Sequence, residues 1–424
     1  MRIAVVGLGH IGLPLAVQYA SRGHDVVGCD IDEAIVAAIN EGRSPHDDEP
    51  ALVERVPQLV RSGRLRATTD DAAGVRGAEV VVVIVPVAVD EHREIDFGPI
   101  EAATREIARG LQPGTLVVYE TTLPVGTTRD RFGPMLETGS GLKVDRDLFL
   151  AFSPERVLVG RVLLDLRRYP KVVGGVTDDS TRRAVAFYRE VLEEGTEVRA
   201  LASAETAEMT KLAETTYRDV NIALANEYAR YASQRGIDVT EVIDAANSQP
   251  YSHIHAPGVG VGGHCIPVYP HFLFNADPDL RLPPMARAIN DGMAGFAVTL
   301  LEERLGSLSG VDVLVLGIAY RGDIREDAFS SAFRLRDELV AAGAVVHAND
   351  PYFSPEHIAG LGFSPYDLDA ATPVRAAVLQ AAHDAYRTLD LARVPGLELL
   401  VDGRNALDPA GVRAAGIAYA GIGR

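Results

Sequence analysis

Residues 2–30, RIAVVGLGHIGLPLAVQYASRGHDVVGCD, contain the stretch that decides the fold. The β-branched run Ile3–Val6 is followed by an amphipathic stretch, Leu13–Ser21, and then by a second apolar run, Val26–Gly28. A helix between two short strands is the β-α-β unit of a parallel sheet. The sequence therefore predicts an α/β fold from its first residues.

The same alternation continues through the first half of the chain. Further strands are predicted at Glu79–Val85, Thr115–Tyr119, Leu148–Phe152 and Lys171–Gly174. We therefore predict a first Rossmann-like domain, with helices on both faces of its sheet, over residues 1–200.

A long helix is predicted next, because Ala202–Arg235 contains almost no Gly or Pro and spaces its apolar residues at helical intervals. Such a helix would span about 50 Å and would connect two domains. Two shorter helices broken near Tyr217 are the alternative.

A second β-α-β region begins at Val311–Ala319 and continues to the C-terminus. Its further strands are predicted at Ala344–Ala348, Ala376–Leu379 and Leu397–Val401. The predicted fold class is therefore α/β, with two Rossmann-like parallel-sheet domains joined by a central long-helix domain. The expected domains are residues 1–200, 201–300 and 301–424.

Charge and cysteine content narrow the functional class. The 59 acidic residues outnumber the 41 basic ones, and the net charge of -18 argues against a nucleic-acid partner. The only cysteines are Cys29 and Cys265, which allows no disulfide framework and no zinc site and fits a cytoplasmic location. No apolar run reaches the roughly 18 residues of a membrane span, so we expect no membrane association.

The glycines Gly7, Gly9 and Gly12 form a GxGxxG motif between the first strand and the first helix. In that context the first glycine permits a tight turn, the second admits a pyrophosphate and the third brings helix and strand together. Asp30 ends the second strand, where a carboxylate can bind both ribose hydroxyls and repels a 2′-phosphate. The motif therefore predicts NAD as cofactor, and a solvated strand end is the alternative for Asp30.

The densest chemical signal is PGVGVGGHCIP at residues 257–267, where four glycines precede Cys265. Such a loop exposes a thiol and lets a bulky ligand approach. Further motifs are TTLPVG at 121–126, SPE at 153–155, KLAETTYRDVN at 211–221, ARAIND at 286–291 and DPY at 350–352. With these motifs the chain resembles the UDP-glucose, UDP-N-acetylmannosamine and GDP-mannose dehydrogenase family over essentially its whole length.

The resemblance implies an NAD-dependent oxidation of a nucleotide-sugar C6 alcohol to a uronic acid, in two hydride transfers. Cys265 would be the nucleophile that forms a thiohemiacetal and then a thioester, and Lys211 would stabilise the oxyanion. Glu155 would serve thioester hydrolysis, and Thr122 would hold a water near C6.

The other site residues follow from the same resemblance. For the cofactor we expect contacts from Gly7, Gly9, His10, Ile11, Gly12, Asp30, Pro86 and Thr122. For the substrate we expect contacts from Glu155, Arg156, Lys211, Tyr251, Gly262, Gly263, Arg321 and Arg404. A solvated surface arginine is the alternative for Arg404. We expect no metal, a nucleotide-diphosphate sugar as the partner molecule, and a homodimer formed through the central helix.

Several residues depart from the family pattern. Tyr269 stands where the family has an aspartate that helps to deprotonate the alcohol, and a phenol with a pKa near about 10 is a poor base at neutral pH. Thr215 replaces an asparagine beside the same water. Other departures are Pro86-Val87-Ala88, Gln249-Pro250-Tyr251 and Ala328-Phe329-Ser330.

These departures leave two alternatives to the complete oxidation. A diverged member could perform a two-electron oxidation, or a redox-neutral epimerisation with transient NAD reduction. A catalytically silent binding subunit is the other alternative, although it would have no need for an exposed thiol among four glycines.

Overall fold

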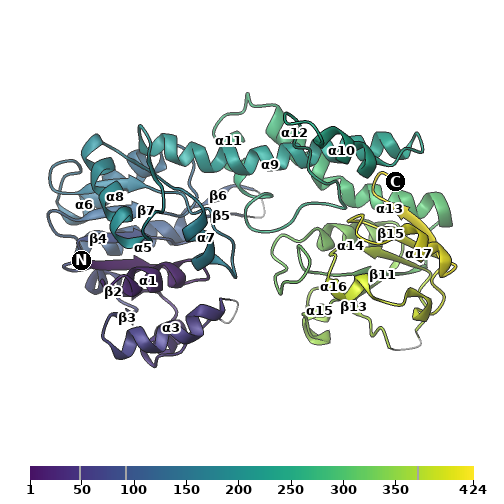
Figure 1. Cartoon of the computed structure of the whole chain (residues 1–424), viewed down its shortest axis with the longest axis horizontal. Coiled ribbons are helices and arrows are strands. Elements are labelled where there is room, and N and C mark those ends of the chain that lie inside the picture. The colour runs from purple at the N-terminus through teal and green to yellow at the C-terminus, as the bar shows by residue number, and fades with distance from the viewer. Residues whose placement is uncertain (47–48, 91–92, 370–371) are drawn as a thin grey trace. The chain divides into compact units, whose positions relative to one another are not determined.

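The computed structural model describes residues 1–46, 49–90, 93–369 and 372–424. The chain forms two compact units, the first from Met1–Glu214 with His271–Ala276 and the second from Thr215–Pro270 with Asp277–Arg424. Each unit contains its own sheet with helices packed on it (Figure 1). The predicted α/β class with two Rossmann-like sheets is confirmed, and the division at residues 200 and 300 stays a prediction.

The sheet of the first unit has eight strands among the described residues. Their order is β10 (Val198–Ala200), β9 (Lys171–Gly175), β8 (Phe149–Phe152), β7 (Leu116–Tyr119), β4 (Val80–Val83), β1 (Arg2–Val6), β2 (Asp25–Cys29) and β3 (Leu65–Thr68). The chain order reverses between β1 and β4, and open α/β sheets bind ligands beyond the carboxyl ends of the strands at such a point.

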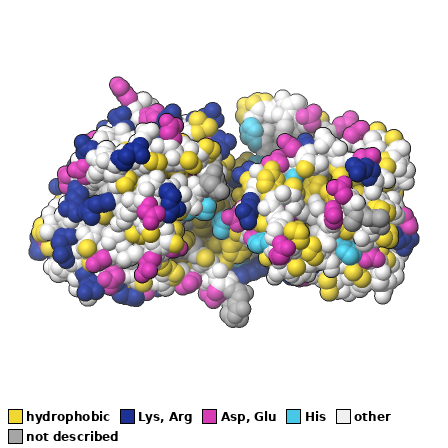
Figure 2. All heavy atoms as spheres, turned by 90° about the horizontal axis from the view of Figure 1, so that it is seen from below, with side chains coloured by type: hydrophobic (Ala, Val, Ile, Leu, Met, Phe, Trp, Pro, Cys, Tyr) yellow, Lys and Arg dark blue, Asp and Glu magenta, His cyan; other side chains and the backbone are white. Residues whose placement is uncertain are grey.

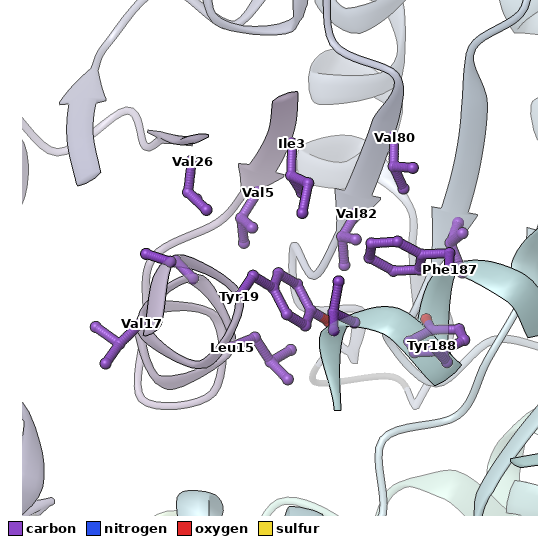
Figure 3. Packing of buried hydrophobic residues seen from close by; sticks show 14 of the residues in the cluster. Ile3, Val5, Leu15, Val17, Tyr19, Val26, Val80, Val82, Phe187 and Tyr188 are labelled. Carbon is purple, nitrogen blue, oxygen red and sulfur yellow. The ribbon is translucent and has the colours of Figure 1, made fainter. Parts of the chain in front are cut away.

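Helices cover both faces of this sheet, which explains why its central strands are apolar throughout. Tyr19 of α1 (Gly12–Ser21) and Phe187 of α8 (Asp178–Val191) share one cluster with Ile3 (Figure 3). On the other face, the Thr104 hydroxyl of α5 (Gly98–Gly110) lies 2.8 Å from the hydroxyl of Tyr119.

One strand departs from the expected parallel pattern. Strand β9 pairs antiparallel with β8, with Ala151 opposite Gly175 and Phe152 opposite Gly174. The first residue of β9, Lys171, therefore lies at the edge of the sheet where the carboxyl ends of β7 and β8 meet.

The remaining elements of the first unit are short. They are α2 (Glu33–Asn40), α3 (Pro50–Arg61), α4 (Asp71–Val75), the hairpin β5 (Ala88–Val89) and β6 (Ile95–Asp96), the π-helix η1 (Thr127–Phe132), α6 (Gly133–Ser140) and α7 (Val162–Arg168).

The long helix α9 (Ala204–Ser233) is continuous over 30 residues. The prediction of one long helix is confirmed, and the alternative of a break near Tyr217 is wrong. The helix begins in the first unit and continues in the second.

The second sheet repeats the winding of the first, with the order β13 (Ser364–Pro365), β12 (Val345–Asn349), β11 (Asp312–Leu316), β14 (Ala376–Leu379), β15 (Leu399–Asp402) and β16 (Ala418–Gly421). Among the described residues, all pairings within this sheet are parallel. The helices of the second unit are α10 (Val239–Asn247), α12 (Leu282–Asp291), α13 (Met293–Leu305), α14 (Ser331–Ala341), α15 (Pro355–Gly360), α16 (Asp384–Arg387), η2 (Leu391–Arg393) and α17 (Pro409–Ala414). Helix α11 (Tyr269–Phe274) begins in the second unit and has its last four residues in the first.

The surface carries both signs of charge. On the face shown in Figure 2, acidic and basic side chains are interspersed over each unit. Among the described residues, no helix combines the length and the apolar character that crossing a bilayer requires.

Candidate functional site

In the loop after β1, backbone geometry explains why two of the three motif positions are glycine. Gly7 has φ +93°, and a Cβ atom on Gly12 would lie 1.8 Å from the carbonyl oxygen of Gly7. A Cβ atom on Gly9 would meet no protein atom within 4 Å. Gly7 and Gly12 therefore fix the turn, whereas Gly9 leaves open space beside the backbone, as a pyrophosphate requires.

Asp30 follows β2 and is tied to this loop. Its Oδ2 accepts a hydrogen bond from the Leu8 amide at 2.7 Å, and its Oδ1 accepts one from the Asp32 amide at 2.9 Å. A carboxylate oxygen can accept more than one hydrogen bond, so both oxygens keep capacity for ribose hydroxyls. The open backbone at Gly9 and this carboxylate fit an NAD molecule.

The start of helix α1 completes this region. Ile11 occupies the N-cap position of the helix, and its apolar side chain cannot accept hydrogen bonds from the first amides. Those amides are left for backbone partners or a ligand. His10 is exposed, and its ring centroid lies 4.4 Å from that of His46 with the planes tilted by 35°. The Nε2 of His46 lies 2.8 Å from the carbonyl oxygen of Leu8. Pro86 is exposed after β4, on the other side of the switch point.

The loop that carries Thr122 is anchored by a residue that the sequence did not single out. Glu208 on α9 accepts hydrogen bonds from the amides of Gly126 at 2.6 Å and Thr128 at 2.9 Å, and from the Thr128 hydroxyl at 2.6 Å. Burial raises the pKa of Glu208 to about 7, against the lowering effect of these hydrogen bonds. Thr122 itself is buried.

Glu155 and Lys211 lie together in the first unit. The Nζ of Lys211 donates to the main-chain carbonyl oxygen of Glu155 at 2.7 Å. The amide of Arg156 donates to Glu155 Oε1 at 2.8 Å, and the Arg156 guanidinium lies 3.0 Å from Glu214. The family resemblance assigned Glu155, Arg156 and Lys211 to the site, and in the structure Lys211 and Arg156 both contact Glu155.

Two buried charges accompany Glu155. Lys171 Nζ lies 2.8 Å from Glu155 Oε2 and 2.6 Å from Glu120 Oε2. Burial alone would raise the pKa of Glu155, but the charge and hydrogen bonds of Lys171 outweigh it and hold that pKa below its ordinary value.

In the second unit, protein atoms fill the space where side chains of Gly262 and Gly263, two of the glycines before Cys265, would lie. A Cβ atom on Gly262 would lie 2.7 Å from Cβ of Tyr320, and one on Gly263 would lie 2.9 Å from the Tyr320 ring. These two glycines therefore pack closely against the segment after β11, where a side chain would clash. Gly263 also donates its amide to the Ala328 carbonyl at 3.0 Å.

Cys265 is exposed at the end of this loop. Its carbonyl oxygen accepts the amide of Tyr269 at 2.9 Å, which starts helix α11 and leaves Tyr269 half-buried. His264 lies 3.5 Å from Glu326, and hydrogen bonding to that carboxylate raises the pKa of His264. The sequence did not single out this pair, because Glu326 is distant along the chain.

Two asparagines of α9 hold the segment that enters the cysteine loop. Asn226 accepts the Gly258 amide at 2.9 Å, and Asn221 accepts the His255 amide at 2.9 Å. Asn221 also donates to the His253 carbonyl at 2.7 Å. The Asn221 and Asn226 positions in the α9 motif therefore have a clear role in shaping the loop.

The four remaining predicted residues differ in their surroundings. Arg404 donates to the carbonyl oxygen of Gly260 at 2.9 Å and to Ser331 Oγ at 3.2 Å, and burial lowers its pKa to about 10. It is thus an anchor of the cysteine loop rather than a solvated surface residue. Arg321 is exposed just after β11, Tyr251 is 92% exposed, and Thr215 is buried one helical turn after Lys211.

Three successive parts of the chain match the domains of one protein family. Residues 1–192 match the NAD binding domain of the UDP-glucose/GDP-mannose dehydrogenase family, residues 205–291 match its central domain, and residues 314–409 match its UDP binding domain. The chain is 36% identical to a UDP-N-acetyl-D-mannosamine dehydrogenase of Pyrococcus horikoshii, covering 100% of this chain and 99% of that protein.

A further relative and a solved structure also have N-acetylated sugars in their names. An NDP-N-acetyl-D-galactosaminuronic acid dehydrogenase of Ralstonia nicotianae is 35% identical over 92% of this chain and 93% of its own length. Among solved structures, the Pyrococcus horikoshii UDP-D-ManNAc dehydrogenase has a TM-score of 0.91 at 35% identity, covering 100% of this chain and 99% of that one.

Proposed function

The chain belongs to the UDP-glucose/GDP-mannose dehydrogenase family, and from this premise we propose that it oxidises a nucleotide-sugar C6 alcohol to a carboxylate. NAD is the cofactor, and when bound it accepts the hydride that leaves C6. The single observation that carries the proposal is the exposed Cys265, because only the second oxidation requires a covalent nucleophile.

The first step is removal of hydride from C6 as the alcohol loses its proton. The cation of Lys211, fixed on the Glu155 carbonyl, stabilises the oxyanion that develops. Thr122 and Thr215 supply hydroxyl groups for an ordered water, and Tyr269 supplies a phenol where the family has an aspartate.

The second step uses the thiolate of Cys265, which adds to the aldehyde carbon to give a thiohemiacetal. Loss of a second hydride, to a second molecule of NAD, gives a thioester. Glu155 then takes a proton from water, the water oxygen bonds to the acyl carbon, and the C–S bond breaks to release the carboxylate and the thiolate.

We propose an N-acetylated sugar linked to a nucleoside diphosphate as the substrate, because two relatives that match almost the whole chain have such sugars in their names. Arg321 and Arg404 would face the nucleotide, with Arg156, Tyr251 and the backbone of Gly262 and Gly263 near the sugar.

A second candidate is a two-electron oxidation or a redox-neutral epimerisation. Tyr269 and Thr215 favour it, because they replace the groups that the family uses to deprotonate the alcohol. If the thioester never forms, the sugar leaves as the C6 aldehyde, whereas removal of a hydride from a ring carbinol and its return to the opposite face would give an epimer.

We also propose a homodimer through α9. Tyr217, Leu224, Tyr228 and Tyr231 are exposed and recur at spacings of seven, four and three residues, which places them on one face of the helix. The two free cysteines support a reducing compartment such as the cytoplasm.

The proposal is tested with purified protein, NAD and a panel of UDP- and GDP-linked sugars, both N-acetylated and not. Mass spectrometry should show a carboxylate in place of the C6 alcohol for at least one N-acetylated sugar. Failure to oxidise any sugar in the panel, with NAD bound, would contradict the proposal.

A further inference from the structure

Two buried charged residues that have no part in the proposed chemistry surround Glu155. Lys171 is 5% exposed and Glu120 is 1% exposed. The ammonium of Lys171 lies between the two carboxylates, 2.6 Å from Glu120 Oε2 and 2.8 Å from Glu155 Oε2. Charged side chains are rarely buried unless they are paired, so such a triad needs a reason.

The fold brings the three residues together from separate strands. Glu120 directly follows β7, and Glu155 follows β8 by three residues. Because β9 runs antiparallel to β8, its first residue, Lys171, lies at the same edge. The amide of Glu155 donates to the Glu120 carbonyl at 3.2 Å, which closes the arrangement.

The core holds the second carboxylate of the triad in place. The hydroxyls of Tyr19 and Tyr188 donate to Glu120 Oε1 at 3.2 and 2.6 Å. Both tyrosines are fully buried in the cluster of the first unit (Figure 3). The Lys171 ammonium also lies 4.9 Å from the Tyr188 ring centroid, a favourable cation–π distance.

Glu155 also accepts hydrogen bonds from two groups other than Lys171. Oε1 accepts the Arg156 amide at 2.8 Å, and the main-chain oxygen accepts the Lys211 ammonium at 2.7 Å. The Arg156 guanidinium pairs with Glu214 instead. Among these contacts, Lys171 is therefore the cation held directly against the carboxylate of Glu155.

We propose that Lys171 and Glu120 are positioning residues for Glu155, with Lys171 fixing and balancing its carboxylate and Glu120 keeping Lys171 paired. The proposal rests on the hydrolytic role proposed for Glu155. When Glu155 takes a proton from water, its negative charge is neutralised. Lys171 then remains paired with ionised Glu120, so the ammonium is not left unpaired in a buried site.

The direction of the pKa shifts agrees with this division of roles. The pKa of Glu155 is held below its ordinary value, because Lys171 outweighs the effect of burial, whereas burial raises that of Glu120 to about 7. Near neutral pH Glu155 is therefore ionised. Its charge is one cause of the raised pKa of Glu120, so protonation of Glu155 favours the ionised form of Glu120 beside Lys171.

The first test is independent of turnover. Protein labelled with ¹³C at the glutamate carboxyl carbon is titrated by NMR without NAD, and Glu155→Gln and Glu120→Gln variants assign the two signals. In Lys171→Met the titration midpoint of Glu155 should rise by more than about one pH unit, because its cationic partner is lost. In Lys171→Arg the midpoint should lie close to the wild-type value. Lys143→Met, which removes an exposed lysine paired with Glu137, should leave it unchanged.

Glu120→Gln keeps the test decisive if Lys171→Met does not fold. Lys171 then has a single anionic partner, so the Glu155 midpoint should fall further. A midpoint that rises or stays unchanged in Glu120→Gln, or that stays unchanged in a folded Lys171→Met, would overturn the proposal.

The second test follows thioester hydrolysis with the sugar that the wild-type protein oxidises. In Lys171→Met the first hydride transfer should keep its rate, whereas hydrolysis should slow by about a hundredfold or more. Quenched protein should then carry an acyl adduct on Cys265, visible as added intact mass.

Unchanged hydrolysis with a shifted Glu155 midpoint would overturn the positioning role. A wild-type protein that gives neither adduct nor carboxylate would contradict the proposed function, while the titration still decides on Lys171.

Discussion

The Nζ atom of Lys211 lies 2.7 Å from the main-chain carbonyl oxygen of Glu155. This hydrogen bond joins helix α9 to the loop after β8, so the proposed oxyanion-binding cation and the proposed hydrolytic base have a fixed relation within one unit. The side chain of Glu155 is left to Lys171 and the Arg156 amide. Glu155 thus holds the Lys211 ammonium with its main-chain oxygen and carries the proposed base on its side chain, and these two groups act in different steps.

Replacing Lys211 should impair chemistry rather than cofactor binding. In Lys211→Ala the rate of NADH formation should fall by about a hundredfold or more, because the developing oxyanion loses its cation. Lys211→Arg keeps the charge and should retain more activity. The measurement is the initial rate at saturating NAD, with NAD affinity by fluorescence titration as the control. A Lys211→Ala variant with wild-type kcat would disprove the role.

The two cysteines provide a matched pair of substitutions. Cys265 is exposed, so Cys265→Ser should change the free energy of unfolding by less than about 0.5 kcal/mol yet abolish carboxylate formation. Cys29 is buried, so Cys29→Ser should destabilise the protein by about 1–3 kcal/mol through an unsatisfied hydroxyl, with activity per folded molecule retained. Denaturant unfolding and product mass measure both effects. Carboxylate from Cys265→Ser at the wild-type rate would be incompatible with a thioester.

Gly9 and Gly12 should respond differently to alanine. A methyl group on Gly12 would lie 1.8 Å from a backbone oxygen, so Gly12→Ala should lower stability severely, by more than about 4 kcal/mol. Gly9 has open space, so Gly9→Ala should fold normally but bind NAD on the order of tenfold more weakly, because the methyl group occupies the pyrophosphate's approach. Thermal unfolding and calorimetric titration distinguish the two. Unchanged NAD affinity in Gly9→Ala would show that the cofactor lies elsewhere.

Glu208 should make stability depend on pH. Its pKa rises on folding from 4.5 to about 7, so the folded state binds the proton more tightly. The stabilisation is complete below pH 4.5 and is lost as pH rises through about 7, by on the order of 3 kcal/mol. Glu208→Gln does not titrate, so the stability of the wild type relative to this variant should decrease over that window. Urea unfolding at a series of pH values measures the difference, and a constant difference would refute the assignment.

Local patterns allowed much of the fold to be predicted from the sequence. The strand around Ile3, the glycine turn at Gly7 and Gly12, and helix α9 depend on neighbouring residues and their periodicity. The helix lacks breakers near Tyr217, which is why it continues through that point. The family resemblance, and not a local pattern, assigned Glu155 and Lys211 to one site. In the structure a hydrogen bond joins the two residues.

Features that depend on distant pairings were not predictable. Nothing near Lys171 indicates an antiparallel strand, so its burial beside Glu120 was not foreseen. The close packing of Gly262 against Tyr320 is set by tertiary structure and was not indicated by the sequence. Arg404 was predicted to contact the substrate, with a solvated surface residue as the alternative, and its hydrogen bond to the Gly260 carbonyl was not foreseen.

The most direct measurement is the number of moles of NADH formed per mole of sugar consumed, with excess NAD and an N-acetylated nucleotide sugar. The account predicts two NADH and one carboxylate, which would mean that Tyr269 and Thr215 can replace the family's usual groups. One NADH with an aldehyde, or none with an epimerised sugar, would contradict the four-electron oxidation.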